Sequence, residues 1–356
     1  MQRTSDIPVP RGLADLTADW LGSALGAAGK VLDVSAEPIG TGQIADSARL
    51  ALTWEPPAAG PTSLVAKVTA ASEASRQAGM TTRTYEVEVG FYSDLAGSLP
   101  VRTPRCYWAG FDPERSAYGV LLEDVAPAHQ GDQLAGCSVD EAAAALEDLA
   151  LLHAPRWGDP DLCSLRWVQE GGRDRGSGLG EILNLLLPGF LERYQTRLSP
   201  EVVELIPRFL HVMDRYGQDH GGTHTILHGD FRNDNLMFGL DRVVVLDWQT
   251  VSLGAALSDV SYFLGGSLLP DLRRQHETGL VQLYWQRLVS LGVEMDWKDC
   301  WSDYRRFAFA GLIMAIFASM VVTPTKRGDD MFVAMADRAG LHALDMDALA
   351  LIPKES

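Results

Sequence analysis

The sequence predicts an α+β fold of two lobes, a small antiparallel β-rich lobe over residues 1–122 and a larger helical lobe over residues 123–356. Two observations predict this division. Short apolar runs with strand character fill the first third of the chain, and helical patterns dominate after a polar connector that follows Leu122. A length of 356 residues is also about two domains' worth of chain at about 150 residues each.

The first lobe is expected to hold adjacent antiparallel strands. Each expected strand is a short apolar or β-branched run bounded by Gly, Pro or Asp turn residues. The expected strands cover residues 48–52, 64–68, 106–110 and 118–122. One helix is expected over residues 82–95, where Tyr85, Val89, Tyr92 and Leu95 recur at helical spacing.

The second lobe is expected to be mostly helical. The segment 140–153 is the clearest helix, because it has acidic residues in its first turn and an apolar stripe. The other expected helices cover residues 181–197, 200–216, 271–291, 299–322 and 329–348. A Gly-rich charged stretch at 170–180 predicts a mobile loop, and the apolar run 240–246 predicts a strand.

Composition and charge exclude several classes of protein. The chain has 46% hydrophobic and 22% charged residues, which is typical of a globular protein and not of a fibrous or disordered one. Its formal net charge of −17 opposes binding to the phosphate backbone of nucleic acid or to anionic lipid. We therefore expect neither a nucleic-acid nor a membrane partner, and the sequence predicts no oligomeric state.

The cellular location is expected to be the cytoplasm. The first ten residues lack the apolar stretch of a signal peptide. The apolar segment 307–322 is shorter than the ~20 residues that cross a bilayer, so we expect a core helix there. The four cysteines show no C-x-x-C pair and no metal-ligand spacing, so buried thiols are expected at Cys106, Cys137, Cys163 and Cys300.

The residues that indicate chemistry lie between 226 and 249. The segment reads His228-Gly229-Asp230, with Asn235 five positions after the Asp, and Asp247 closes a short apolar run. Phosphoryl transfer needs a carboxylate near the attacking hydroxyl and oxygen ligands that hold Mg²⁺ against the nucleotide's phosphates. This spacing of Asp, Asn and a second Asp supplies both.

These motifs resemble those of the aminoglycoside phosphotransferase and choline kinase superfamily, whose catalytic loop reads H-G-D-x-x-x-x-N. The Asp-Trp-Gln form at 247–249 and the stretch 88–92 look most like the ecdysteroid-kinase-like branch and its bacterial relatives. The resemblance implies a protein-kinase-like fold that binds ATP and Mg²⁺. It also implies that Asp230 is the catalytic base and that Asn235 and Asp247 are the Mg²⁺ ligands.

The same resemblance implies a nucleotide clamp in the first lobe. Lys67 matches the strand lysine that holds the α and β phosphates. Its partner is expected to be Glu88 in preference to Glu86. The phosphate-covering loop would use Gly40, Gly42 and Ser47, although Asp46 in that loop would repel phosphate unless it points away.

Two further positions follow from the resemblance. Main-chain groups at Glu123 and Val125 match the connector that binds adenine. Asp259 matches an Asp that braces the catalytic loop. In the C-terminal helices, Trp285, Trp297, Trp301 and Tyr304 recur at helical spacing, which is usual for core residues and is also compatible with a stacking surface for an apolar acceptor.

Three functional readings remain open at this level. The first is a kinase that phosphorylates a hydroxyl of a small metabolite, such as a steroid-like or other polycyclic alcohol. The second is an aminoglycoside phosphotransferase, which the acidic net charge favours. The third is a nucleotide-binding module without phosphotransfer activity, and the presence of Asp230, Asn235, Asp247 and Lys67 argues against it.

Overall fold

The computed structural model describes residues 7–26, 28–40, 44–170, 176–218 and 222–353. The chain forms two compact units. Unit 1 comprises Met1–Ser98, Thr103–Pro127 and Leu246–Thr250, and unit 2 comprises Leu99–Arg102, Ala128–Val245 and Val251–Ser356. The fold is α+β, with a sheet-rich N-terminal region and a helical C-terminal region, as predicted. The predicted domain boundary after residue 122 stays a prediction.

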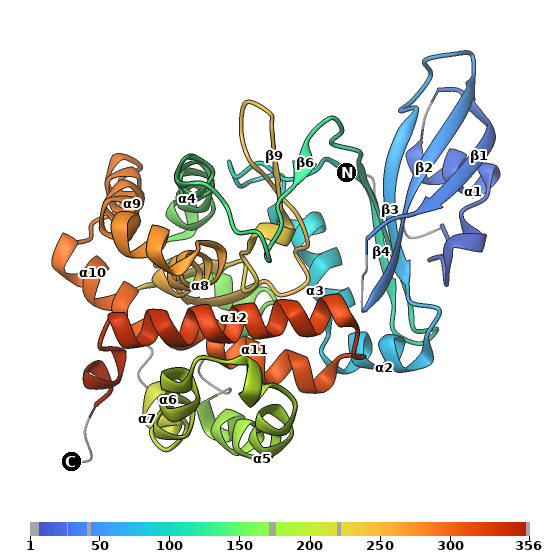
Figure 1. Cartoon of the computed structure of the whole chain (residues 1–356). Helices are drawn as coiled ribbons and strands as arrows, with labels where there is room; N and C mark the ends of the chain where they lie inside the picture. The colour runs from blue at the N-terminus through green and yellow to red at the C-terminus, as the bar shows by residue number, and fades with distance from the viewer. Residues whose placement is uncertain (1–6, 27, 41–43, 171–175, 219–221, 354–356) are drawn as a thin grey trace. The chain divides into compact units, whose positions relative to one another are not determined.

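Unit 1 is organised around an antiparallel five-stranded sheet (Figure 1). Its strands lie in the order β1 (Lys30–Pro38), β2 (Ala45–Glu55), β3 (Ser63–Thr69), β5 (Ala117–Glu123) and β4 (Cys106–Asp112). All four predicted strands are present. The sequence analysis missed β1, a largely exposed edge strand, although its apolar residues Leu32, Val34 and Ala36 alternate with polar ones.

Helices of unit 1 complete its core. The helix α1 (Ala18–Leu25) contributes Leu21 to a buried cluster with Trp54, Trp108 and strand residues. The predicted helix at 82–95 is present as α3 (Thr84–Gly90) followed by a π-helical turn, η2 (Phe91–Leu95). It is preceded by α2 (Glu73–Thr81). This helix was not predicted, because most of its residues are polar or small.

Unit 2 is mainly helical (Figure 1). The described helices are α4 (Val139–His153), α5 (Gly176–Tyr194), α6 (Pro200–Leu210), α7 (Met213–Gln218), α8 (Leu257–Ser267), α9 (Pro270–Ser290), α10 (Trp297–Arg306), α11 (Ala310–Val321) and α12 (Lys326–Asp345). The helix α4 begins at a capping box, in which Ser138 and Glu141 satisfy each other's backbone N–H groups.

Several predicted boundaries in unit 2 were wrong. The predicted helix 200–216 is divided into α6 and α7, and the segment 299–322 is divided by a 3₁₀ turn at Phe307–Phe309. The predicted loop 170–180 ends in the first turns of α5, and residues 171–175 lie outside the described residues. The helix α8 was missed, because it is buried on all sides and so lacks a polar face.

Short strands of unit 2 precede and follow residues 228–235, which hold the His-Gly-Asp motif. One small sheet has the order β10 (Val244–Val245), β9 (Leu236–Phe238) and β6 (His129–Gln130). The other has the order β7 (Gln169–Glu170), β11 (Ser252–Ala255) and β8 (His224–Leu227). The predicted strand 240–246 is reduced to β10. The loop between β8 and β9 holds residues 228–235.

One helical stretch of the described chain, Trp297–Val321, is long and apolar enough to cross a membrane, and 44% of its apolar window is buried. Length and composition alone are weak evidence for a span. One face of α11 is buried, including Leu312, Ala315 and Ile316. The prediction of a core helix here stays a prediction.

The prediction that the four thiols are buried was wrong for Cys163, which is exposed. Cys137 and Cys300 are buried, and Cys106 is half-buried. Cys163 follows Leu162 in a 3₁₀ turn that buries only Leu162, so its side chain points outward.

Candidate functional site

The loop 228–235 is anchored at its start by α8. Asp259 accepts hydrogen bonds from the backbone N–H groups of His228 (2.7 Å) and Gly229 (3.1 Å). Gly229 has a φ of +81°, a left-handed conformation that costs little only for glycine. The buried His228 ring accepts the N–H of Asp230 through Nδ1 over 3.2 Å, so this histidine braces the loop.

The Asp230 carboxylate is held by three side chains. Tyr262 donates its hydroxyl to Oδ1 over 2.6 Å, and Asn235 donates its amide nitrogen to Oδ2 over 2.9 Å. The Nε of Arg232 lies 3.1 Å from both oxygens. The Asp230 side chain is still 17% exposed, so a hydroxyl group can reach it.

Arg232 also binds a second carboxylate. Its Nη1 donates to Oδ2 of Asp234 over 2.6 Å and lies 3.4 Å from the sulfur of Met331. Burial alone would lower the pKa of Arg232, but the charges of Asp230 and Asp234 outweigh burial and raise it. The sequence analysis missed Arg232, although its place between two aspartates in the motif was a signal of this neutralising role.

Asn235 is buried and faces Asp230. Its amide nitrogen donates to the backbone oxygen of Asp230 over 2.9 Å as well as to the carboxylate. Because the nitrogen is used in this way, the amide oxygen is the atom of Asn235 that a cation would bind. The structure therefore brings together two of the predicted site residues, Asp230 and Asn235, in unit 2.

Unit 1 holds a second cluster of predicted site residues. The Nζ of Lys67 donates to both oxygens of Glu88, over 2.7 and 2.8 Å, and to Oδ1 of Asp247 over 2.7 Å. Burial by itself would lower the pKa of Lys67, but the carboxylates of Asp247 and Glu88 outweigh burial and raise it. The lysine is therefore a fixed positive charge on β3.

The partner of Lys67 is Glu88 and not Glu86, as the sequence analysis preferred. Glu86 instead pairs with Arg83 over 2.8 Å at the surface. Glu88 is buried and also accepts a hydrogen bond from the hydroxyl of Tyr118 on β5, a residue that the sequence analysis did not single out. Burial and the charge of Glu88 raise the pKa of Tyr118 well above its ordinary value, so its hydroxyl stays a donor.

Asp247 is fixed by its neighbours in the chain. Its φ of +63° lies in the left-handed region, which Asp tolerates better than most residues but at some energetic cost. The adjacent Trp248 is fully buried and stacks on Phe91 of η2, with ring centroids 3.9 Å apart and planes within 5°. Gln249 donates to Oδ2 of Asp247 over 3.2 Å.

The predicted phosphate-covering loop is described only in part. Gly40 has a φ of +71° and open space where a Cβ would stand, whereas Gly42 lies outside the described residues. Ser47 on β2 is the register partner of Lys67 on β3. Asp46 points to the backbone, where it accepts the N–H of Ala71 over 2.9 Å, so its charge is partly satisfied there.

The predicted adenine connector lies at the end of β5. Glu123 donates its N–H to the backbone oxygen of Arg105 over 2.8 Å and accepts the N–H of Arg105 over 3.1 Å through its carboxylate. Its N–H is therefore occupied by the sheet. Val125 is buried just beyond the strand, and its predicted main-chain contact with adenine stays a prediction.

The aromatic residues of the C-terminal helices pack on one another. Ring contacts run from Trp285 to Trp297, Trp301 and Tyr304, with centroid distances of 5.3–5.8 Å. Trp285 donates its indole N–H to the backbone oxygen of Met295 over 2.7 Å. These contacts favour a packing role for the aromatic set over an acceptor surface.

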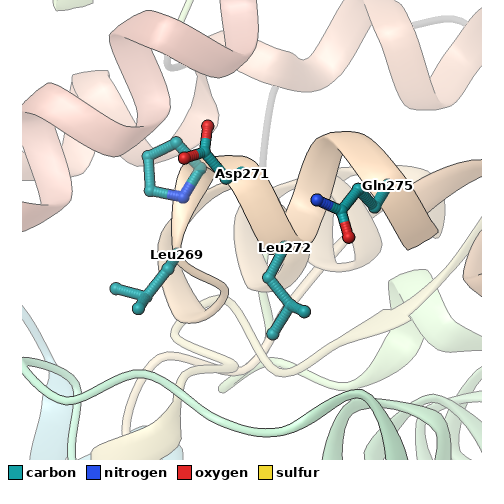
Figure 2. Close-up of a pocket in the computed structure, with 5 residues that line it drawn as sticks. Leu269, Asp271, Leu272 and Gln275 are labelled. Carbon is teal, nitrogen blue, oxygen red and sulfur yellow. The ribbon is translucent and has the colours of Figure 1, made fainter.

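A hollow of ≈570 Å³ lies at the beginning of α9, lined by Leu269, Pro270, Asp271, Leu272 and Gln275. Figure 2 shows the side chains of Leu269 and Leu272 pointing to the same side of the helix, while Asp271 points away. None of its lining residues belongs to the predicted site, and we assign it no role.

Each of the two predicted Mg²⁺ ligands offers an oxygen of the kind that this ion prefers. Magnesium prefers oxygen ligands, and usually takes one or two carboxylates together with water and substrate phosphates. Asn235 offers an amide oxygen and Asp247 a carboxylate, each held by its own neighbours. Among the described residues, no group of three or more His, Cys, Asp and Glu side chains is placed to hold a metal ion, and the assignment of Mg²⁺ to these two residues stays a prediction.

Comparison with known families supports the resemblance of the motifs. Residues 183–295 match the ecdysteroid kinase-like family. A curated mouse protein, acyl-CoA dehydrogenase family member 10, is 34% identical over 99 residues, which are 24% of this chain. The match spans only 9% of the length of that relative.

Solved structures share the fold at low identity. They include a Ralstonia eutropha JMP134 protein assigned as an aminoglycoside phosphotransferase, with 20% identity and a TM-score of 0.54 over 92% of this chain and 97% of that chain. Choline kinase from Cryptosporidium parvum Iowa II has 9% identity and a TM-score of 0.56, and the match covers 88% of this chain and 89% of the choline kinase chain. Macrolide 2′-phosphotransferase from Brachybacterium faecium has 15% identity and a TM-score of 0.52, and the match covers 90% of this chain and 97% of the phosphotransferase chain. The resemblance predicted from the motifs is confirmed, and the fold is kinase-like.

Proposed function

We propose that this chain, which has the fold of the aminoglycoside phosphotransferase and choline kinase superfamily, is an ATP-dependent small-molecule kinase. It would transfer the γ-phosphate to a hydroxyl group of a small acceptor. One observation carries the proposal. The Asp230 carboxylate is partly exposed, and hydrogen bonds from Tyr262, Asn235 and Arg232 hold its orientation.

The two units supply complementary groups in this proposal. In unit 1, Lys67 offers a fixed positive charge for the α and β phosphates, supported by Glu88. In unit 2, Asp230 orients the acceptor hydroxyl. Mg²⁺, held through Asn235 and Asp247, would neutralise charge on the phosphates.

The chemical step is an in-line displacement at the γ-phosphorus. The acceptor oxygen forms a bond to phosphorus while the bond to the β–γ bridging oxygen breaks, and ADP leaves. The hydroxyl proton passes to a carboxylate oxygen of Asp230. Because the transition state of phosphoryl transfer is loose, Asp230 contributes orientation as well as proton acceptance.

The acceptor is proposed at the level of a hydroxylated small metabolite. The match to the ecdysteroid kinase-like family over residues 183–295 favours a steroid-like or polycyclic alcohol as the first class to test. The alternative is an amino sugar, which the net charge of −17 favours. We also propose that the protein is located in the cytoplasm.

A catalytically silent nucleotide-binding module is the second candidate. It would retain Lys67, Glu88 and Asp247 for nucleotide binding but would not need an oriented base. Tyr262 and Arg232 argue against it, because they hold the Asp230 carboxylate and have no part in the proposed nucleotide contacts.

The test is transfer of labelled γ-phosphate from ATP, with Mg²⁺, to pooled sterols, polyketide alcohols, amino sugars, choline and simple sugars. Asp230→Asn is the control. A labelled product that is absent from the control supports the kinase and identifies the acceptor class. ATP binding without any product across the panel supports the silent module, and the absence of ATP binding contradicts the site assignment.

A further inference from the structure

The helix α8 meets the catalytic loop at two positions on one face. Asp259 and Tyr262 are three residues apart, and residues at that spacing lie side by side on a helix. Asp259 binds the backbone N–H groups at the start of the loop. Tyr262, one turn later, donates its hydroxyl to the Asp230 side chain over 2.6 Å. One rigid element therefore holds both the main chain and the carboxylate.

We propose that Tyr262 is a positioning residue for phosphoryl transfer, which fixes the orientation of the Asp230 carboxylate toward the acceptor hydroxyl. The inference rests on the proposed function, because Asp230 needs a fixed orientation only if it acts on an acceptor. Tyr262 itself touches neither the acceptor nor the nucleotide in this proposal, and it acts through Asp230.

The other donors do not fix the carboxylate by themselves. The torsion that rotates an aspartate carboxylate has broad preferences, so its orientation is set by hydrogen bonds. The single N–H of Arg232 Nε is equidistant from both oxygens, at 3.1 Å, and favours neither. Asn235 binds only Oδ2 and Tyr262 only Oδ1. The two bonds together prevent the rotation that either bond alone would permit.

The arrangement also leaves room for the acceptor. An ionised carboxylate offers about four lone-pair positions. Tyr262 and Asn235 take one position on each oxygen, and the N–H of Arg232 is shared between the two oxygens at 3.1 Å, a long contact that an acceptor hydroxyl can displace from one of them. Without Tyr262 a second position on Oδ1 would open to water, and the hydroxyl would no longer be directed to a single place.

The surroundings of Tyr262 keep it in this role. The residue is only 6% exposed, and buried tyrosine hydroxyls require a partner. Burial is the main cause that raises the pKa of Tyr262 well above its ordinary value. The charges of Asp230 and Asp259 raise the pKa further, while Arg232 lowers it. The phenol therefore keeps its proton and acts as a hydrogen-bond donor to Asp230.

The kinetic test compares Tyr262→Phe with Tyr194→Phe. Tyr194 makes the same kind of bond elsewhere in unit 2, from its hydroxyl to Asp329 over 2.9 Å. We expect Tyr262→Phe to lower kcat about 10- to 100-fold with little change in KM for ATP, because misplacing a reacting group costs up to that factor. Tyr194→Phe should leave kcat unchanged. A raised KM with unchanged kcat, or an equal loss in both variants, would overturn the proposal.

The second part of the test asks whether Tyr262 acts through Asp230. In the Asp230→Ala background, adding Tyr262→Phe should change the residual rate less than about two-fold, because residues that act as a unit are not additive. If the second substitution costs the same factor in both backgrounds, Tyr262 does not work through Asp230 and the proposal is wrong.

Urea unfolding of the wild type, Tyr262→Phe, Asp230→Ala and the double variant separates this inference from the proposed function. These measurements need neither nucleotide nor acceptor. The contact predicts that Tyr262→Phe shifts the unfolding midpoint in the wild-type background and shifts it much less when Asp230 is already Ala. Equal shifts would overturn the proposal whatever the activity. If the wild type transfers phosphate to no acceptor although the coupling is present, the proposed function fails, and the catalytic role of Tyr262 fails with it.

Discussion

The Nε of Arg232 lies 3.1 Å from both carboxylate oxygens of Asp230, two residues earlier in the chain. The same guanidinium reaches Asp234, so one cation balances two acidic groups of the loop. The negative charge of the proposed base, Asp230, is therefore balanced by a side chain of its own loop. The pairing matters because an unpaired charge in a half-buried loop would be costly.

Replacement of Arg232 tests this balance. Arg232→Gln should lower the free energy of unfolding by about 2 kcal/mol, because two mostly buried aspartates lose the cation that they share. Arg327→Gln is the matched control. Arg327 is 49% exposed and lies 3.4 Å from Asp234, so its loss should cost less than about 1 kcal/mol. Urea denaturation measures both, and equal losses would contradict the balance.

Gly229→Ala tests the backbone of the loop. An alanine at the φ of +81° should cost about 1–2 kcal/mol of stability and should also lower kcat, because the strain displaces the adjacent Asp230. Gly292→Ala is the control, since Gly292 has a φ of +91° after α9 and open space around it. It should lose similar stability and keep full activity. Loss of activity in both variants would show that general destabilisation is the cause.

Trp248 tests how Asp247 is placed. Its stack on Phe91 has the same geometry as the stack of Phe209 on Phe309 in unit 2, with centroids 3.9 Å apart and planes within 5°. Trp248→Leu and Phe309→Leu should each lower the free energy of unfolding by on the order of 2 kcal/mol. Only Trp248→Leu should reduce the rise in Tm that ATP and Mg²⁺ produce. A reduced rise in both variants would argue against a local role.

Two neighbouring glutamates test the nucleotide cluster. Glu88→Gln removes a buried charge that orients Lys67, so the Kd for ATP should rise about 10-fold or more. Glu86→Gln removes only a surface pair with Arg83 and should leave the Kd unchanged. Isothermal calorimetry measures both values. Equal effects of the two substitutions would contradict the assignment of Glu88.

The sequence predicted the parts of the site that local patterns encode. The spacing of Asp230 and Asn235 in one loop and the placement of Lys67 on a strand are short-range features. The contact of Lys67 with Glu88 also followed from motif order, and the structure has it. Antiparallel strands were predictable because turn residues bound each one.

Contacts between distant segments were not predictable. Tyr262 reaches Asp230 from a helix that is buried on all sides and so shows no periodic pattern. Tyr118 reaches Glu88 from a strand in which it reads as an ordinary core residue. Such roles depend on tertiary structure, which no local spacing encodes.

The most direct test of the central claim measures ATP binding and phosphoryl transfer together in Asp230→Asn. The account predicts that the Kd for ATP in the presence of Mg²⁺ stays within about three-fold of the wild-type value, because the nucleotide is assigned to Lys67, Glu88 and Asp247. It predicts that transfer to the acceptor falls about 10²- to 10⁴-fold. An Asp230→Asn variant that transfers phosphate at the wild-type rate would contradict the account.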